Sequence, residues 1–304
     1  MRTRVERLAW VTTRAARGRD EDEPLALAAL ERAGVRVEVV DWDDPGARWS
    51  RFDRVVVRSA WDYPERLAEF LRWLDEVDAV SDLVNPPATV RWSLDKRYLA
   101  ELEGAGIPTT PTAFAPPGAP VAFPAGRFVV KPAVGAGSRD AASYGPDQHE
   151  PARAHVARLH AAGTVVLVQP FLSSVAAEGE WPLVFFDGVF SHAANKRVAL
   201  PRAGSIDGLF AEETNTEHVA TEAQLAVARS VTDLVARRLG TPTYARVDLV
   251  RDDAGAFRVL ELELNEPSLF LPQGGADAVE RLVAALLRWP PVGRGPGRAA
   301  PAAG

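Results

Sequence analysis

The chain of 304 residues contains no cysteine, which excludes disulfides, thiolate nucleophiles and zinc sites with cysteine ligands. This absence fits a reducing compartment, so a cytoplasmic protein is expected. An excess of positive charge is also lacking, because the net charge of −6 argues against a nucleic-acid partner. No uninterrupted apolar stretch is long enough to span a membrane, and the N-terminal residues lack the pattern of a signal peptide.

Lysine is nearly absent as well. Of the 35 lysine and arginine residues, the only lysines are Lys96, Lys131 and Lys196, and the other 32 are arginines. A chain that uses arginine wherever either cation serves keeps lysine where a compact ammonium is needed. The three lysines are therefore candidates for functional positions; the alternative is that three lysines remain by chance.

The first ninety residues alternate between predicted strands and helices, which indicates a parallel α/β layer. The predicted strands are 7–12, 35–40 and 54–57, and the predicted helices are 24–33 and 65–77. Ligands bind such sheets beyond the carboxyl ends of the strands. The segment 59–63 is thus a candidate wall of a substrate site, although its Trp61 and Tyr63 fit equally well as packing for the next helix.

Residues 244–271 form the most informative stretch, two predicted strands joined by a tight turn. Side chains alternate along a strand, so the second strand is expected to point acids to one face and leucines to the core. The shared polar face carries Glu261, Glu263 and Asn265. The leucines expected in the core are Leu260, Leu262 and Leu264. Crowded carboxylates need solvent, an arginine or a metal, and such oxygen ligands suit Mg²⁺; the alternative is an ordinary solvated strand face.

A second polar motif follows the predicted strand 127–131, which ends in Lys131. Gly135, Gly137 and Ser138 come directly after it, and glycines let backbone N–H groups approach an anion closely. A lysine beside such a loop is suited to binding phosphate. The loop lacks the Walker A pattern, and the GxG pattern by itself is weak. Lys96 is expected in the first turn of a helix at 94–105.

Six motifs occur in the order NPPATVRWSLDK, FVVKP with GAGSR, VLVQPFL, GEWPLVFFDGVFSHAANKR, ARVDLV and LELELNEPSLFL. This order resembles the ATP-grasp superfamily, in the branch of the glutathione synthetases, D-alanine–D-alanine ligases and ribosomal-protein S6 glutamate ligases. The chain looks most similar to small actinobacterial members, including the cyclo-ligase that closes the ring of D-cycloserine. The resemblance covers roughly residues 85 to 290.

The resemblance implies an α/β ATP-grasp fold in which two α+β subdomains grip ATP between them. The expected division is a pre-ATP-grasp domain at 1–88, a central lid subdomain at 89–170, a C-terminal subdomain with the metal site at 171–290, and a disordered tail at 291–304. ATP and Mg²⁺, as two ions, are the implied cofactors. The implied partner is a small amino-acid-like molecule, with no nucleic acid or membrane, and the resemblance also admits a homodimer.

The resemblance also implies the roles of individual residues. Phosphate contacts are implied for Lys96, Lys131 and Lys196, and a lid over the phosphates for Gly135, Gly137 and Ser138. The adenine hinge is implied at Gln169, Pro170, Phe171 and Leu172, and the ribose acid at Glu180, with Glu178 as its alternative. Arg246 would steady the transferring phosphoryl group and the developing oxyanion.

The implied Mg²⁺ ligands are Asp248, Glu261, Glu263 and Asn265, and two registers fit them. Spacing from Asp248 favours Glu261 with Glu263, whereas the Glu-x-Asn pattern of many relatives favours Glu263 with Asn265. The expected function is ATP-dependent ligation of a carboxylate to an amine through an acyl phosphate. A kinase that stops at phosphorylation and a non-catalytic nucleotide-binding protein are the alternatives. Segment 201–216 lacks the arginine-bearing loop of relatives, so the substrate does not follow from the resemblance.

Overall fold

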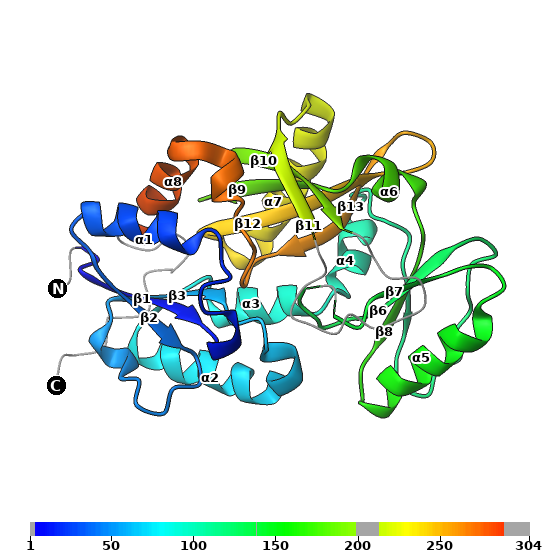
Figure 1. Cartoon of the computed structure of the whole chain (residues 1–304), viewed down its shortest axis with the longest axis horizontal. Helices are drawn as coiled ribbons and strands as arrows, with labels where there is room; N and C mark the ends of the chain where they lie inside the picture. The colour runs from blue at the N-terminus through cyan, green and yellow to red at the C-terminus, as the bar shows by residue number, and fades with distance from the viewer. Residues whose placement is uncertain (1–3, 138, 199–212, 289–304) are drawn as a thin grey trace.

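The computed structural model describes residues 4–137, 139–198 and 213–288, which form three β-sheets (Figure 1). The N-terminal sheet and the sheet of residues 113–170 lie at opposite ends of the molecule, and the largest sheet lies between them. Parallel pairing in the first sheet and antiparallel pairing in the other two confirm the predicted α/β class. The predicted tail and Ser138 lie outside the described residues.

The first sheet is wholly parallel, as predicted, with strand order β2-β1-β3-β4. Its strands are β1 (Arg7–Thr12), β2 (Arg36–Asp41), β3 (Arg54–Ser59) and β4 (Asp82–Val84), and its connecting helices are α1 (Glu23–Arg32) and α2 (Leu67–Val80). Alternation along β1 divides two cores: Leu8 and Trp10 pack on the α1 side, and Ala9 and Val11 on the α2 side. Both faces of the sheet are therefore covered.

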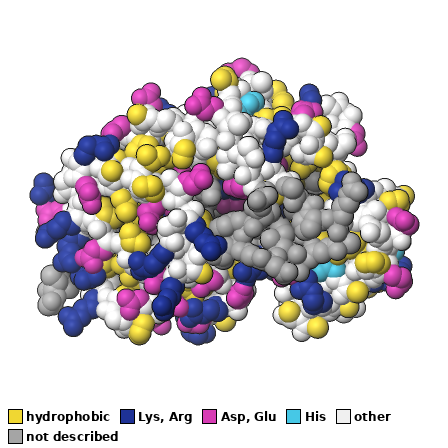
Figure 2. All heavy atoms as spheres, viewed as in Figure 1, with side chains coloured by type: hydrophobic (Ala, Val, Ile, Leu, Met, Phe, Trp, Pro, Cys, Tyr) yellow, Lys and Arg dark blue, Asp and Glu magenta, His cyan; other side chains and the backbone are white. Residues whose placement is uncertain are grey.

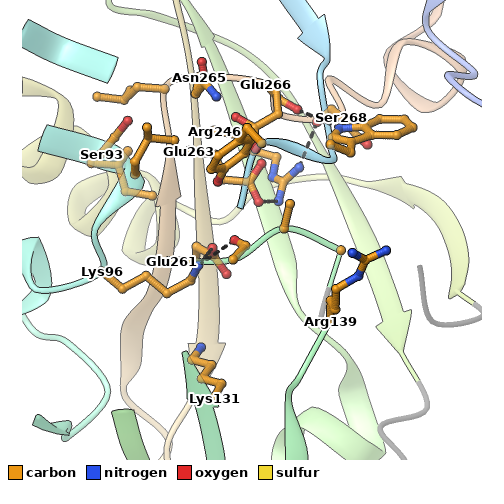
Figure 3. Close-up of a pocket in the computed structure, with 18 of the residues that line it drawn as sticks. Ser93, Lys96, Lys131, Arg139, Arg246, Glu261, Glu263, Asn265, Glu266 and Ser268 are labelled. Carbon is orange, nitrogen blue, oxygen red and sulfur yellow. Dashed lines mark hydrogen bonds and ion pairs between the residues drawn. The ribbon is translucent and has the colours of Figure 1, made fainter. Parts of the chain in front are cut away.

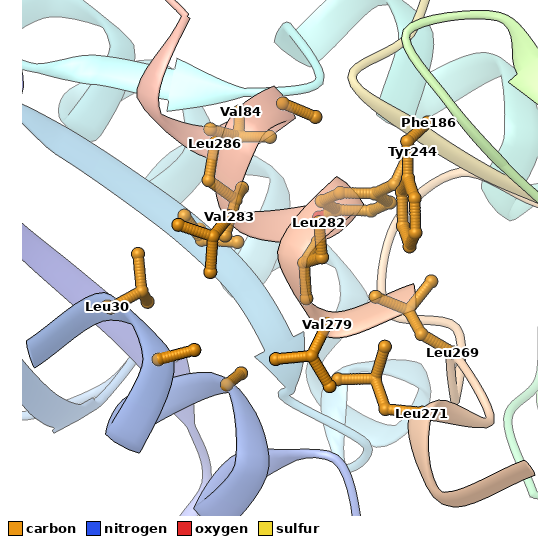
Figure 4. Close-up of a cluster of buried hydrophobic side chains, with 14 of the residues drawn as sticks. Leu30, Val84, Phe186, Tyr244, Leu269, Leu271, Val279, Leu282, Val283 and Leu286 are labelled. Atoms are coloured by element: carbon orange, nitrogen blue, oxygen red, sulfur yellow. The ribbon is translucent and has the colours of Figure 1, made fainter. Parts of the chain in front are cut away.

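Helix α8 (Leu271–Leu287) completes the core on the α1 side of the first sheet (Figure 4). Its Val279, Leu282 and Val283 share one core cluster with Leu30 of α1, and Leu282 lies beside Tyr244. A kink interrupts the helix at Gly275, where φ is 69°, and the residues on both sides of the kink are helical. Helix α8, which belongs to the predicted C-terminal subdomain, thus completes the core of the N-terminal domain. The predicted domain bounds stay a prediction.

The middle sheet has the order β11-β10-β9-β12-β13 and is antiparallel throughout. Its strands are β9 (Trp181–Phe186), β10 (Val189–Val198), β11 (Glu213–His218), β12 (Tyr244–Arg251) and β13 (Phe257–Glu263). The helices next to it in sequence are α6 (Ser173–Glu178) and α7 (Glu222–Leu239). Helix α7, which starts at a capping box between Thr221 and Gln224, covers one face and leaves the other for the polar side chains of the site.

The predicted helix at 94–105 is wrong as a single element. Helix α3 (Pro87–Leu94) ends before Asp95, whose backbone is extended, and α4 (Tyr98–Gly104) begins three residues later. The Asp95 carboxylate accepts a hydrogen bond from the Arg97 N–H and so competes with helical pairing. Lys96 therefore lies in the connection between the helices, where its N–H donates to the Ala133 carbonyl.

The prediction that Leu260 faces the core is also wrong, because a β-bulge interrupts β13. Asp248 pairs with Glu261, but the next residue of β12, Leu249, pairs with Val259, which leaves Leu260 as the extra residue. Val259 takes the core position instead, together with Leu262 and Leu264 as predicted. The shared face of Glu261 and Glu263 is unaffected, since both lie on one side of the bulge.

The third sheet has the order β5-β8-β6-β7. Its strands are β5 (Ala113–Ala115), β6 (Phe128–Pro132), β7 (Ala142–Tyr144) and β8 (Val166–Pro170), and helix α5 (His149–Ala161) covers one face. Phe128 and Val130 of β6 pack on α5, so the alternate residue Lys131 points to the other face. Leu167 on that face packs with residues of the middle sheet, which brings Lys131 towards the metal-ligand candidates.

The described surface mixes both signs of charge. Figure 2 shows lysine and arginine side chains interspersed with acidic ones over the first sheet and its helices. Among the helices of the described residues, not one has the length and apolarity needed to cross a membrane.

Candidate active site

A cavity of 120 Å³ lies where the three sheets meet (Figure 3). Nine of the predicted site residues line it: Lys96, Lys131, Gly135, Gly137, Lys196, Arg246, Glu261, Glu263 and Asn265. Trp61 and Tyr63 also line it from the first layer, and Tyr63 packs on Phe70 of the next helix, as the second interpretation of segment 59–63 expected; a role of this segment in binding substrate stays a prediction. All three lysines of the chain thus line one cavity, and their functional roles stay a prediction.

Two of the lysines approach the cavity from different elements, Lys96 from the α3–α4 connection and Lys131 from strand β6. Lys96 Nζ lies 3.0 Å from Glu261 Oε1 and also donates to the Gly135 carbonyl at 3.0 Å. Lys131 rises from β6 towards the same place (Figure 3). Burial and the nearby Lys96 ammonium lower the pKa of Lys131, although Glu261 opposes them. A bound anion would relieve this repulsion between cations.

The third lysine, Lys196, lies on strand β10 of the middle sheet. Its Nζ is 2.8 Å from Glu180 Oε2 and 3.8 Å from Asp248 Oδ2. The backbones of Glu180 and Lys196 also exchange two hydrogen bonds. Gly179 permits this close approach, since its φ is 85° and a Cβ would lie 2.6 Å from the Lys196 carbonyl oxygen. Glycine at this position thus sets the distance between the α6–β9 turn and Lys196.

Arg246 is buried and joins three parts of the site. Its guanidinium binds both Asp248 oxygens at 2.7 and 2.8 Å, Glu263 Oε1 at 2.6 Å and the Ser268 carbonyl at 3.1 Å. Such charge-assisted, forked pairing fixes the guanidinium firmly. Asp248 is only 1% exposed and does not appear among the described residues that line the cavity.

The acids of the cavity differ in pKa. Burial raises the pKa of Glu261, but Lys96 and Lys131 outweigh it and lower the value to about 2. Burial raises the pKa of Glu263 to about 7, against the effect of Arg246. Burial and the Glu263 charge raise the pKa of Glu266 to about 8. Glu263 and Glu266 therefore hold their protons more tightly than free carboxyl groups do, and a bound cation would favour their ionised forms.

These residues fit Mg²⁺ by their chemistry. Asp248, Glu261, Glu263 and Asn265 offer oxygen donors only, the kind that this ion prefers. Asn265 is buried, and neither polar atom of its amide has a hydrogen-bond partner in the described part of the chain. Among the described residues, however, no three histidine, cysteine or acidic side chains are already gathered as a metal site. The ligand set and its register stay predictions.

The predicted hinge and ribose residues lie outside this group of lining residues. Gln169 is buried and donates to Thr112 Oγ1 at 2.9 Å, and the Phe171 N–H donates to the Arg127 carbonyl. The Arg127 guanidinium lies 3.7 Å from the centre of the Phe171 ring. Pro170 ends β8, Leu172 is buried beside it, Glu180 pairs with Lys196, and Glu178 pairs with Arg251.

Several cavity residues were not predicted as site residues, among them Arg139, Glu213, Glu266, Ser268 and Phe270. Arg139 pairs with Glu65 of the first layer, a contact that no local pattern signals. Phe270 has a left-handed backbone, with φ at 51°. The polar run directly after Asn265 was the one available signal for Glu266 and Ser268.

Comparison with known proteins gives the family. The cycloserine biosynthesis protein DcsG of Streptomyces lavendulae is 42% identical over 277 residues, which cover 87% of this chain and 92% of that protein. The chain belongs to the D-cycloserine synthetase family. The family profile for the N-terminal domain of D-cycloserine synthetase matches residues 8–85. As a member of this family, the chain is an ATP-grasp enzyme that ligates a carboxylate to an amine.

Solved structures agree with membership of the D-cycloserine synthetase family. The crystal structure of D-cycloserine synthetase DcsG matches with a TM-score of 0.84 and 40% identity, covering 92% of this chain and 98% of that one. A D-alanine–D-alanine ligase from Bacillus anthracis matches with a TM-score of 0.66 and 14% identity, over 92% of this chain and 96% of that one. The second likeness shows the shared ATP-grasp fold alone.

Proposed function

We propose that this ligase activates the carboxylate of a small amino-acid-like substrate and closes it on an amine of the same molecule. The γ-phosphoryl group of ATP passes to a carboxylate oxygen, and ADP leaves. The amine nitrogen then bonds to the carbonyl carbon, the carbon–oxygen bond to phosphate breaks, and the nitrogen loses a proton. The products are a cyclic amide, ADP and phosphate, and the relative's name supports the ring-closing form.

The gathering of Lys96, Lys131 and Lys196 in one cavity with Arg246 carries this proposal. Three ammonium groups from different elements suit a triphosphate, whose charge they would neutralise during transfer. The Arg246 fork would stabilise the negative charge that develops on the carboxylate oxygen. No nucleophile on the protein is needed, which fits a chain with no cysteine and five histidines.

Mg²⁺ would be held by Glu261 and Glu263 together with Asp248 or Asn265, and two ions are expected. When bound, it neutralises phosphate charge and orients the triphosphate. Without the metal, Lys96 pairs with Glu261 and Arg246 pairs with Glu263. When Mg²⁺ and ATP bind together, the metal would pair with the two acids and the phosphates with the two cations.

The remaining assignments rest on the family resemblance. Adenine is assigned to the hinge of Gln169, Pro170, Phe171 and Leu172, the ribose to Glu180, and the phosphate lid to Gly135, Gly137 and Ser138. The domain bounds at 88 and 170, a cytoplasmic location and a homodimer belong to the same proposal. Light scattering of the purified chain measures the last of these.

The test offers the enzyme Mg²⁺, ATP and a panel of amino acids. The panel includes O-amino-D-serine, the open-chain acid that hydrolysis of the ring amide of D-cycloserine would give, together with its L-enantiomer, D-serine and D-alanine. We expect phosphate release with O-amino-D-serine and a product lighter by one water in mass spectrometry. A phosphorylated product that does not lose phosphate would instead identify a kinase. Lack of ATP consumption with every acid would refute the proposed substrate class.

A further inference from the structure

Two acids just before α1 differ in how their carboxylates are satisfied. Asp22 pairs with Arg58 and accepts hydrogen bonds from the N–H groups of Leu269 and Leu271 at 2.5 and 2.8 Å. Asp20 is also buried, at 6% exposure, but only its Oδ1 is used, by the Asp22 N–H. Its Oδ2 has no hydrogen-bond partner among the described residues.

A buried carboxylate oxygen without a donor costs stability, so it calls for an explanation. Asp20 lines a second cavity, of 190 Å³, bordered by the segment before α1, the start of α8 and strand β11. Asn215 of β11 lines the same cavity, and its Oδ1 is likewise buried without a partner in the described part of the chain. Its Nδ2 is held by Glu213 Oε1 at 3.0 Å. Two residues that line one cavity therefore each carry an unused acceptor oxygen.

The second cavity adjoins the active-site cavity. Four side chains line both of them: Trp61, Glu213, Ser268 and Phe270. The charged groups around the second cavity are mostly acidic: Asp20, Glu21, Asp22 and Glu213 outnumber Arg19. Its position beyond the carboxyl end of β1 is where parallel sheets bind ligands. A small ligand that donates hydrogen bonds and carries a positive charge fits both the unused acceptor oxygens and the negative charge of the surrounding acids.

We propose that the second cavity binds the ammonium group of the amino-acid substrate, with Asp20 Oδ2 and Asn215 Oδ1 as its acceptors. This inference rests on the proposed function, which places the substrate carboxylate beside Arg246 in the adjoining cavity. An amino acid that closes a ring carries a second amine that must not react. Hydrogen bonding to Asp20 holds that amine protonated, without a lone pair for attack, and sets which end of the substrate faces ATP.

The test measures binding of D-cycloserine to the full chain in the presence of Mg²⁺ and ADP by calorimetry. Asp20→Asn keeps the shape and the bond to the Asp22 N–H but removes the charge, and we expect it to weaken D-cycloserine binding at least tenfold. N-acetyl-D-cycloserine, which has no ammonium, should bind the parent chain weakly and lose nothing further in Asp20→Asn. Glu23→Gln, three residues along the chain at a residue that does not line this cavity, should bind like the parent.

Asn215→Ala, on a different element, provides an independent second variant and should also weaken D-cycloserine binding. Affinity for Mg²⁺–ADP should be equal in all variants, which shows that each is folded. If Asp20→Asn and Asn215→Ala bind D-cycloserine as tightly as the parent, the ammonium site is refuted while the ligase proposal stands. If the parent binds Mg²⁺–ADP but not D-cycloserine, the proposed substrate class fails, and this assignment fails with it.

Discussion

At the scale of single residues, composition was a better guide than local pattern. The scarcity of lysine in an arginine-rich chain made each of the three lysines a candidate functional residue, and all three line the same cavity. Asp20 and Arg139 could not be found in this way, because their significance depends on partners from distant segments or on the lack of them. A buried oxygen without a donor is a property of the fold, so sequence reasoning has no access to it.

Replacing Lys131 by arginine should impair ATP binding, although this chain otherwise favours arginine. A guanidinium is larger and forked, so it would crowd a space already shared with Lys96 and Lys196. We expect Mg²⁺–ATP affinity, measured by calorimetry, to fall by about tenfold or more. The exposed Arg36 offers the control, because Arg36→Lys should bind like the parent. Parent-like ATP affinity in Lys131→Arg would contradict the composition argument.

Asp20→Asn should stabilise the ligand-free protein at alkaline pH. Burial raises the pKa of Asp20 from 3.8 to about 6, with the Asp22 charge adding to it and Arg58 opposing. The folded state therefore holds this proton more tightly than the unfolded state, so the parent loses stability as the pH rises from about 4 to about 6. Above pH 7 the variant should be more stable by up to about 3 kcal/mol, and near pH 4 the two should match.

Urea unfolding of both proteins at pH 4 and pH 8 measures this difference. The comparison is made without ligand, because a bound ammonium would stabilise the ionised Asp20 carboxylate and offset the free-energy cost of burying it. An equal free energy of unfolding at pH 8 would mean that the Asp20 carboxylate already has a partner.

At the scale of elements, the strands and helices of the first layer were predicted well, whereas the break inside the predicted helix 94–105 and several short strands were missed. Strand β11 (ETNTEH) has no apolar residue to mark an inward face, and its pairing with β10 holds it. Strands β5 and β7 have three residues each, too few to show alternation. The bulge at Leu260 depends on the register of the partner strand. Non-local pairing decided each of these cases.

The segment 132–144 should become protected when nucleotide binds. Its glycine-rich part lines the cavity, and an ion pair between Arg139 and Glu65 connects the segment to the first layer. A triphosphate would give its N–H groups a partner and exclude water from the acyl phosphate. Hydrogen exchange with Mg²⁺ and a non-hydrolysable ATP analogue should show slower exchange here and at 169–172. Amides of β1 serve as the unchanged reference; unaltered exchange in 132–144 at saturation would rule out a phosphate lid.

At the scale of the whole molecule, a buried ion pair of the first layer contacts the middle sheet and the segment that follows it. Arg58 pairs with Asp22, donates to the Pro267 carbonyl at 2.6 Å, and lies between the rings of Trp10 and Tyr244. Asp22 in turn holds the backbone of 269–271. The layers are thereby fixed to each other at the edge of both cavities.

Asp22→Ala should destabilise the entire chain, because it leaves the Arg58 charge buried without its carboxylate. Breaking such a pair from one side costs about 3–5 kcal/mol. We expect the midpoint of guanidinium unfolding to fall for fluorescence and circular dichroism alike, as one cooperative transition. Glu6→Gln, in an exposed pair with Arg4, should leave the midpoint unchanged. A small loss in Asp22→Ala, or a transition confined to one probe, would argue against the connection.

The packing of α8 on the first sheet has a consequence for synthesis of the chain. The ribosome completes β4 at Val84, yet the helix that covers Leu8, Trp10 and Val56 begins only at Leu271. At about 5–20 residues per second, roughly 10–40 s pass before that helix is made. During this interval the nascent first layer exposes an apolar face, which makes it a client for chaperones and a point at which a stalled or truncated chain would aggregate.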